Sequence, residues 1–450
     1  MVSRPGVGRQ SIAFEMDANE LVLGQGRQSG DLTFAGQDQF GLLIRERLRF
    51  ESGDYKVEVT FRLENRHAVP QTVEVLLPWA TVREWPKDQG ELFQGQRPSR
   101  VVSLSDGQVH RVELSAVTDS SGVDGQWIGL ESEWYLAAIV SQTPGLKLFT
   151  AKGENGMVEV GLKAVPPPLA PGQVWEGRVL YYVGPKQYDR LKALGVGLEG
   201  AIFFGGFPVP RSYGGLPMEW FCVPILWLMN FFYRYSGNYG LAIILLTLMA
   251  KILFYPLTVK SMASMKAMQS LQPQINALRA KHKNDPQRVQ RETMELYRKY
   301  KINPMGGCLP MVIQIPIFYA LYVTLSVAVE LQNSALLCLG KTPAWVPGLG
   351  GAELWICDLA QQDPTYILPL LMGASMFIQQ KMTPMMGDPR QAKIMLMMPV
   401  VFTFMFLNLP SGLVLYWLVS NILQILQQYY MNRRAKPTGK DSPKEKGSQR

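Results

Sequence analysis

The chain of 450 residues is 47% apolar and carries a formal net charge of +9 at neutral pH, with 45 basic and 36 acidic side chains. Its length allows two or more domains. Its four cysteines and three histidines include no CxxC pair and no cluster with zinc spacing. A zinc site or a histidine-based catalytic centre is therefore disfavoured, and we expect no cofactor.

The first 200 residues have the composition of a soluble β domain. Residues 55–65 alternate with a period of two, which places on one face Val57, Val59, Phe61 and Leu63. Other strand-like runs, separated by clusters of Gly, Pro, Asp and Ser, cover residues 72–79, 133–140, 157–165 and 177–184. We therefore predict an all-β sandwich over residues 1–200, supersandwich-like, with mostly antiparallel strands.

Residues 201–236 are predicted to be a linker that ends in an interfacial helix. The run 216–236 is apolar and aromatic, but Pro224 interrupts it and Arg234 lies near its end. This pattern is typical of a helix that lies along a bilayer surface. The alternative is a first spanning helix, which would leave a turn of only two residues before the next apolar run.

Five apolar runs predict a bundle of five transmembrane helices within residues 237–432. About 20 helical residues cover the roughly 30 Å of a bilayer's hydrocarbon layer. The runs are Tyr239–Thr258, Cys308–Leu331, Tyr366–Met382, Ile394–Leu409 and Gly412–Tyr430. The third and fourth cover only about 25 Å, so we expect them to thin the local bilayer.

Charge asymmetry predicts the orientation of these helices. Bases exceed acids in three regions, namely a helical hairpin broken at Asp285–Pro286 within 259–303, a loop at 383–393 and a disordered tail at 433–450. The loop 332–363 instead has one base and three acids. The positive-inside rule places the basic regions in the cytoplasm, and the acidic loop and the β domain outside.

An exported β domain needs a targeting signal, and the first residues contain no apolar segment of a signal peptide. We therefore expect that an N-terminal anchor helix is missing from this chain. Cys338 and Cys357 both lie in the loop that is predicted to be outside. The sequence leaves open whether they form a disulfide.

A single positive charge, Lys251, interrupts the first apolar run. A lysine at the centre of a spanning helix costs on the order of 2.5–3.5 kcal/mol on insertion scales. It is tolerated if its side chain extends to the headgroups or if it faces water inside the protein, and both remain open. Polar residues in the apolar runs that would line a hydrated cavity are Thr247, Gln314, Asn421 and Gln424.

Three methionines, Met262, Met265 and Met268, recur on one face of the basic hairpin. Methionine is soft and adaptable, so the stripe predicts contact with varied apolar segments; packing against a neighbouring helix is the alternative. The surrounding bases suit anionic lipid or ribosomal RNA. Anchoring by the positive-inside rule alone explains these bases equally well.

The helical region closely resembles the YidC/Oxa family of membrane-protein insertases over residues 200–432. The segments that carry the resemblance are KILFYPLT (251–258), LQPQINALRAKHKNDPQR (271–288), INPMGGCLPMVIQIPIFYALY (302–322), DLAQQDPTYILPLLMG (358–373) and LPSGLVLYWLVSNILQILQQ (409–428). They follow the order and spacing of the family. Residues 1–200 resemble, more weakly, the large periplasmic domain of Gram-negative members.

The resemblance implies a hydrophilic groove that is open to the cytoplasm and to lipid. In this groove an arginine attracts the polar outer segment of a substrate, and Lys251 stands at the matching position. Lysine keeps the charge but lacks the bidentate fork of arginine. Tyr416 and Trp417 match positions near the substrate path, and substrates are expected to slide along the helices at 308–331 and 394–409.

The resemblance further implies a membrane-protein insertase and chaperone of the bacterial inner membrane, not an enzyme. It would move polar segments of nascent membrane proteins across a thinned bilayer, alone or with the Sec translocon. The hairpin would receive the nascent chain, the tail would contact ribosomes, anionic lipid would bind the bases, and the chain would act as a monomer.

Two other functions are weighed against this one. Lys251 could serve as the base of an intramembrane Ser-Lys hydrolase, but no serine shares its helix and no GxSxG motif occurs. A small-molecule transporter is the other alternative. The five runs show no inverted repeat and no acidic ion site, which disfavours it.

Overall fold

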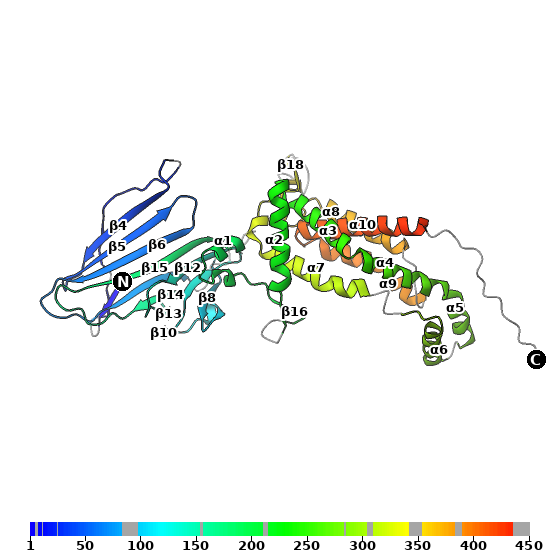
Figure 1. Cartoon of the computed structure of the whole chain (residues 1–450), viewed down its shortest axis with the longest axis horizontal. Helices are drawn as coiled ribbons and strands as arrows, with labels where there is room; N and C mark the ends of the chain where they lie inside the picture. Colours follow the sequence, from blue (N-terminus) through cyan, green and yellow to red (C-terminus); the bar gives the residue numbers. More distant parts are fainter. Residues whose placement is uncertain are drawn as a thin grey trace, which may run out of the picture. The chain divides into compact units, whose positions relative to one another are not determined.

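The computed structural model describes residues 1–4, 8–10, 12–24, 26–82, 98–153, 156–209, 215–282, 285–303, 309–341, 353–382 and 389–434. The chain divides into two compact units, Met1–Phe203 and Phe204–Arg450. The first unit is built mainly of strands and the second mainly of helices (Figure 1). Each unit is described by itself.

The described residues of the first unit form mainly two antiparallel sheets. Among the described residues, the larger sheet has the strand order β3 (Glu15–Met16), β4 (Ser29–Gln37), β5 (Leu42–Glu51), β6 (Lys56–Asn65), β15 (Val174–Pro185), β12 (Tyr135–Ser141), β11 (Trp127–Glu131), β8 (Arg100–Ser105), β9 (Gln108–Glu113). The smaller has the order β10 (Ser120–Val123), β13 (Lys147–Lys152), β14 (Met157–Ala164), β7 (Glu74–Val82), β1 (Val2–Arg4), β2 (Gly8–Gln10). One apolar core joins residues of both sheets, so the predicted antiparallel β domain is confirmed.

The alternation along β6 shows how the sequence builds this core. Val59, Phe61 and Leu63 are at most 1% exposed, because successive side chains of a strand point to opposite faces. They share the core with residues such as Val160 and Leu162 of β14. The strand β15 leads into the short helix α1 (Tyr188–Ala193).

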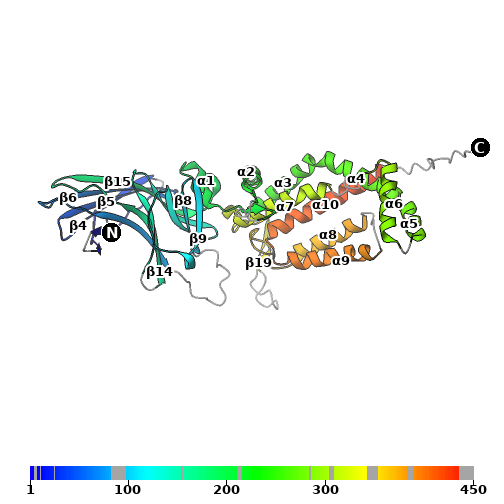
Figure 2. The same ribbon diagram turned by 90° about the horizontal axis from the view of Figure 1, so that it is seen from below.

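The second unit contains nine helices in its described residues. They are α2 (Glu219–Ser236), α3 (Tyr239–Leu253), α4 (Tyr255–Ser270), α5 (Gln272–Lys281), α6 (Pro286–Lys299), α7 (Leu309–Val327), α8 (Ile367–Met382), α9 (Pro389–Phe406) and α10 (Ser411–Arg434). Its described residues also form two short ribbons, β16 (Gly206–Phe207) with β17 (Leu216–Pro217), and β18 (Leu337–Lys341) with β19 (Glu353–Ile356). Helices α3, α7, α8, α9 and α10 run lengthwise in a bundle, and α2 runs crosswise to them (Figures 1 and 2).

These five lengthwise helices overlap the five predicted apolar runs. Within the described ranges, no single helix is both long and apolar enough to qualify as a bilayer crossing. Helices α3 and α4 qualify only as a pair, which is bent by 61°. The number of crossings therefore stays a prediction.

Two boundaries differ from the prediction. Helix α9 begins at Pro389, so its first residues lie within the predicted loop 383–393. The range 259–303 holds most of α4 and then α5 and α6, rather than two helices. Its extra break comes at Leu271, because Pro273 lies in the first turn of α5 and cannot continue the hydrogen bonding of α4.

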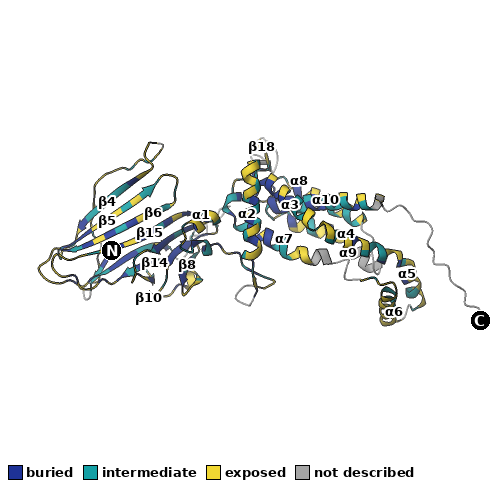
Figure 3. Cartoon of the chain, in the orientation of Figure 1, coloured by how far each residue is buried: buried dark blue, intermediate teal, exposed yellow. Residues whose placement is uncertain are grey.

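Many large apolar side chains of this unit are exposed, and exposed positions are yellow in Figure 3. Ile252 on α3 is 74% exposed and Phe404 on α9 is 67% exposed. Trp220 on α2 is 70% exposed, while Cys222 of the same helix is fully buried. Where exposed apolar residues form a large contiguous patch, the patch marks contact with a membrane or with another protein.

Candidate functional site

Lys251 stands in the last turn of α3, which ends at Leu253. The chain bends at Phe254 because Pro256 lies in the first turn of α4 and has no N–H to donate to the preceding turn. The prediction of one unbroken helix over Tyr239–Thr258 is therefore wrong. A cation in a last helical turn also interacts favourably with the helix dipole, by about 0.3–1 kcal/mol when exposed.

The side chain of Lys251 reaches helix α10. Its Nζ donates a hydrogen bond of 3.0 Å to Oε1 of Gln424, and the residue is partly buried. Gln424 is neutral, so this bond orients the ammonium without cancelling its charge. No carboxylate of the described residues forms an ion pair with Lys251.

Helix α10 carries a line of polar side chains toward its neighbours. Asn421 donates from Nδ2 to Oγ of Ser375 on α8, at 3.2 Å. Gln428 donates from Nε2 to the main-chain oxygen of Met382 at the end of α8, at 2.7 Å. The spacing of Asn421, Gln424 and Gln428 puts all three on one side of the helix.

Two residues of these contacts, Ser375 on α8 and Gln428 on α10, were not predicted from the sequence. Ser375 gave no signal, because a serine in an apolar helix is ordinarily bonded to its own backbone; it does bond the main-chain oxygen of Met372 at 2.6 Å. Gln428 did give a signal, since it extends the helical spacing of Asn421 and Gln424.

Three other predicted residues are placed differently. Thr247 is 1% exposed, and its hydroxyl donates to the main-chain oxygen of Ile243 in its own helix at 2.7 Å. This hydrogen bond is made within α3 and does not involve Lys251. Gln314 on α7 is exposed. It interacts with the hydroxyl of Tyr416, which lies on α10.

Trp417 lies in an aromatic cluster rather than beside Lys251. Its ring centroid is 4.6 Å from that of Phe318 on α7, and 5.1 Å and 6.1 Å from those of Phe406 and Phe402 on α9. Gln424 lies seven positions after Trp417, which is roughly 10 Å along the helix. Tyr416 and Trp417 therefore mark a second level of α10, nearer its N-terminal end.

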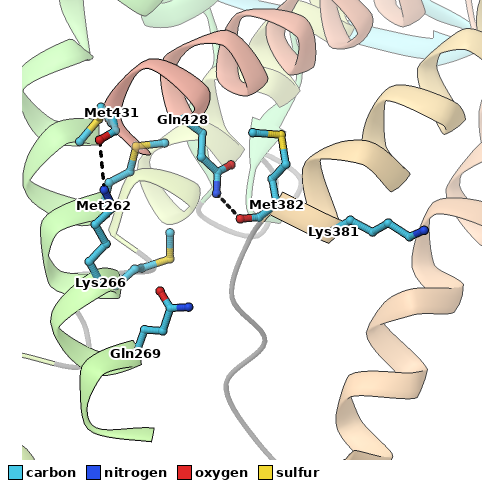
Figure 4. A pocket seen from close by; sticks show the side chains of 8 residues that line it. Met262, Lys266, Gln269, Lys381, Met382, Gln428 and Met431 are labelled. Atoms are coloured by element: carbon cyan, nitrogen blue, oxygen red, sulfur yellow. Dashed lines mark hydrogen bonds between the residues drawn. The ribbon is translucent and has the colours of Figure 1, made fainter. Parts of the chain in front are cut away.

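A methionine-rich pocket lies between α4, α8 and α10, with a volume of about 320 Å³ (Figure 4). Its lining includes Met262, Met265, Met382 and Met431, together with Lys266, Gln269, Lys381 and Gln428. Lys266 donates from Nζ to the main-chain oxygen of Met431 at 3.3 Å. Met268 is 3% exposed and is not among the lining residues.

Comparison with known proteins gives consistent matches over both units. The family model described as "60Kd inner membrane protein" matches residues 231–438, and the one described as "YidC periplasmic domain" matches residues 3–227. The membrane protein insertase YidC of Syntrophus aciditrophicus is 43% identical over 423 residues, which cover 94% of this chain and 73% of that protein. The membrane protein insertase YidC of Geobacter sulfurreducens is 39% identical over 439 residues, covering 95% and 76%.

A solved structure is also similar. The active YidC insertase crystal structure with the first transmembrane domain resolved is 19% identical, with a TM-score of 0.41, and the match covers 89% of this chain and 76% of that one.

Proposed function

Because the chain belongs to the YidC family of membrane-protein insertases, we propose a way in which its residues carry out insertion. The chain is a membrane protein insertase and not an enzyme, it acts on nascent membrane proteins, and its first unit is a periplasmic β-rich domain. The relatives support neither the transporter nor the Ser-Lys hydrolase.

We propose that Lys251 is a fixed positive charge in a hydrophilic groove bordered by α3, α8 and α10. The observation that carries this proposal is its hydrogen bond to the neutral amide of Gln424, which leaves the charge available for an acidic segment of a substrate. Taking a polar amide or hydroxyl into hydrocarbon without a hydrogen-bond partner costs about 4–8 kcal/mol. Asn421 and Gln428 offer such partners along the same helix.

The proposed groove opens toward the cytoplasm, with α3, α7, α8, α9 and α10 as five crossings. The charge asymmetry supports this orientation. So does the disulfide between Cys338 and Cys357, because disulfides persist in oxidising compartments such as the periplasm. We therefore propose that the loop between α7 and α8 lies outside and that the C-terminal end of α10 lies in the cytoplasm.

The proposed groove lies beside a thinned bilayer. Helix α8 has 16 residues, which span about 24 Å against a hydrocarbon layer of roughly 30 Å. A helix that is too short thins the bilayer around it or tilts its flanking residues inward. The dry path of a polar substrate segment is then shorter.

The methionine-rich pocket is proposed as the first contact for apolar segments of a nascent chain, since Met262 and Met265 line it and methionine adapts to varied partners. The bases of α5 and α6, including Arg279, Lys281 and Arg298, are proposed to bind anionic lipid and ribosomes.

The chain is further proposed to act as a monomer and to cooperate with the Sec translocon.

A reconstituted insertion assay tests the role of Lys251. We expect Lys251→Glu to lower the insertion of substrates with acidic outer segments by at least about tenfold, since reversal of one charge in a low-dielectric site costs more than 1.4 kcal/mol. Lys251→Arg, which keeps the charge, should insert them at close to the normal rate. Normal insertion by Lys251→Glu would contradict the proposal.

A further inference from the structure

The loop between α7 and α8 is bonded to the first turns of three helices. We call its described residues, 328–341 and 353–366, the outer plug. At α3, Asn238 donates from Nδ2 to the main-chain oxygen of Leu336 at 3.0 Å. A side chain at Gly240 would place its Cβ 2.8 Å from Cα of Leu336, so the glycine permits this close approach.

The same plug holds the first turn of α10. The main-chain N–H of Ser411 donates to the oxygen of Gln361 at 2.7 Å, and that of Gly412 donates to the oxygen of Leu359 at 2.9 Å. The hydroxyl of Ser411 donates to the oxygen of Asp358 at 2.7 Å. The first N–H groups of a helix lack partners within the helix, and here the plug supplies such contacts at the start of α10.

The first turn of α8 is capped by Asp363, which is 2% exposed. One carboxylate oxygen accepts from the main-chain N–H of Leu368 at 2.8 Å, and the other accepts from the N–H of Thr365 at 2.9 Å. An acidic cap at a helix N-terminus stabilises it by typically about 1 kcal/mol. All three helices therefore begin on contacts with one plug.

The disulfide joins the two halves of the plug. Cys338 lies two residues after Leu336, which contacts α3, and Cys357 directly precedes Asp358, which contacts α10. Apart from the disulfide, the halves are joined by main-chain bonds such as the one from Leu336 to Ile356, at 3.0 Å. Two-stranded ribbons of this size are only marginally stable alone.

We propose that oxidation of Cys338 and Cys357 locks the outer plug and thereby holds the outer ends of α3, α8 and α10 together. This inference rests on the outer location given to the loop in the proposed function. In the oxidation, the two thiols lose two protons and two electrons, the S–S bond forms, and a disulfide-bearing oxidase of the outer compartment is reduced to its dithiol. The chain is thus itself a substrate of dithiol oxidation.

Two measurements on the full chain in lipid test the lock. The first is alkylation of the purified protein with and without reductant, followed by mass spectrometry of peptides with Cys338 and Cys357. The second is hydrogen exchange of residues 357–366 and 409–413 before and after reduction. We expect both thiols to be protected without reductant, and exchange at these residues to accelerate by at least about tenfold on reduction, since the cross-link no longer opposes local opening.

Matched controls distinguish the effect of the disulfide on exchange in the plug from a general destabilisation of the chain. The variant with Cys338→Ser and Cys357→Ser should exchange like the reduced protein, whereas Cys222→Ser, which alters a buried cysteine of α2 outside the plug, should exchange like the oxidised one. Strand β12 of the other unit should be unaffected throughout. Alkylation of both thiols without reductant, or unchanged exchange after reduction, would overturn the lock. Neither readout uses insertion activity, so failure of the groove mechanism would be recognised separately.

Discussion

At position 251 an ammonium and a neutral amide share one hydrogen bond between two helices. Their pairing could be anticipated only in part from the sequence. The rarity of a lysine in an apolar run identified Lys251, and the occurrence of polar residues within the last apolar run identified Asn421 and Gln424. That Gln424 and not Asn421 is the partner depends on how α3 and α10 pack, which no local pattern specifies.

Because Gln424 is neutral, substitutions at this position can distinguish the effect of an added charge from that of a changed side-chain shape. Gln424→Glu keeps the size of the side chain and its acceptor oxygen but places an anion 3.0 Å from the ammonium, where Oε1 now lies. It should neutralise the groove and lower insertion of acidic substrates several-fold, because nearby opposite charges interact strongly in a site of low dielectric. Gln424→Leu removes the hydrogen-bond acceptor but leaves the positive charge of Lys251, so it should reduce insertion less. The reverse order in the insertion assay would mean that Gln424 acts only through packing.

A buried charge in the β-rich unit gives a pH-dependent prediction. Lys186 is 5% exposed and donates to the oxygen of Ser132 at 2.8 Å, and its Nζ lies 3.4 Å from Oε2 of Glu131. Burial lowers the pKa of Lys186 below its ordinary value of 10.5, although Glu131 opposes this shift. The folded unit therefore releases this proton at a lower pH than the unfolded chain does.

The direction of the pH dependence follows from the linkage between proton binding and unfolding. Between the lowered pKa and 10.5, the unfolded chain holds more protons, so the contribution of Lys186 makes the free energy of unfolding increase with pH. Lys186→Met should lack this contribution. The measurement is the exchange of the most protected amides of strands β11 and β12 in the whole protein, compared between the two chains from pH 8 upward. Equal pH slopes would show that Lys186 does not titrate in this way.

Among the elements, α8 and α9 approach each other closely at one glycine. A Cβ at Gly373 would lie 2.0 Å from Oγ1 of Thr403 on α9, and that hydroxyl donates to the oxygen of Pro399 at 2.7 Å. Gly373→Ala therefore forces the helices apart or displaces the threonine side chain. Overpacking of this kind typically costs about 1–3 kcal/mol.

We expect Gly373→Ala to lower the thermal unfolding temperature of the helical unit and to weaken insertion through the altered α8–α9 pair. Adding Thr403→Ala, which removes the clashing oxygen, should restore part of the lost stability, since the two positions are in contact and their effects are not additive. The measurement is thermal unfolding in detergent or lipid. If the double variant is no more stable than Gly373→Ala, the predicted contact is not the cause.

The elements also show where sequence patterns are strong and where they fail. Alternation located β6, because the strand has one buried face, and long apolar runs located the bundle helices. The bend between α3 and α4 was missed because Pro256 lies inside an apolar run whose composition does not change. Strand β10, at the edge of the smaller sheet, was missed as well, since all four of its residues are exposed and show no alternation.

For the whole molecule, we propose that water reaches the side of α3 that carries Lys251 while the neighbouring side faces lipid. The exposure of Ile252, at 74%, places an apolar control directly beside the test position. The family establishes the function of insertion. The hydrated groove is the mechanism that we propose for it.

The most direct test labels single cysteines at these two adjacent positions. Lys251→Cys and Ile252→Cys would each be made with Cys222 and Cys308 replaced by serine, and treated with a water-soluble maleimide from the cytoplasmic side of membrane vesicles. The account predicts rapid labelling at position 251 and protection at position 252, because the thiol reacts as the thiolate in water and not within lipid. Protection at both positions, or equal labelling at both, would contradict it.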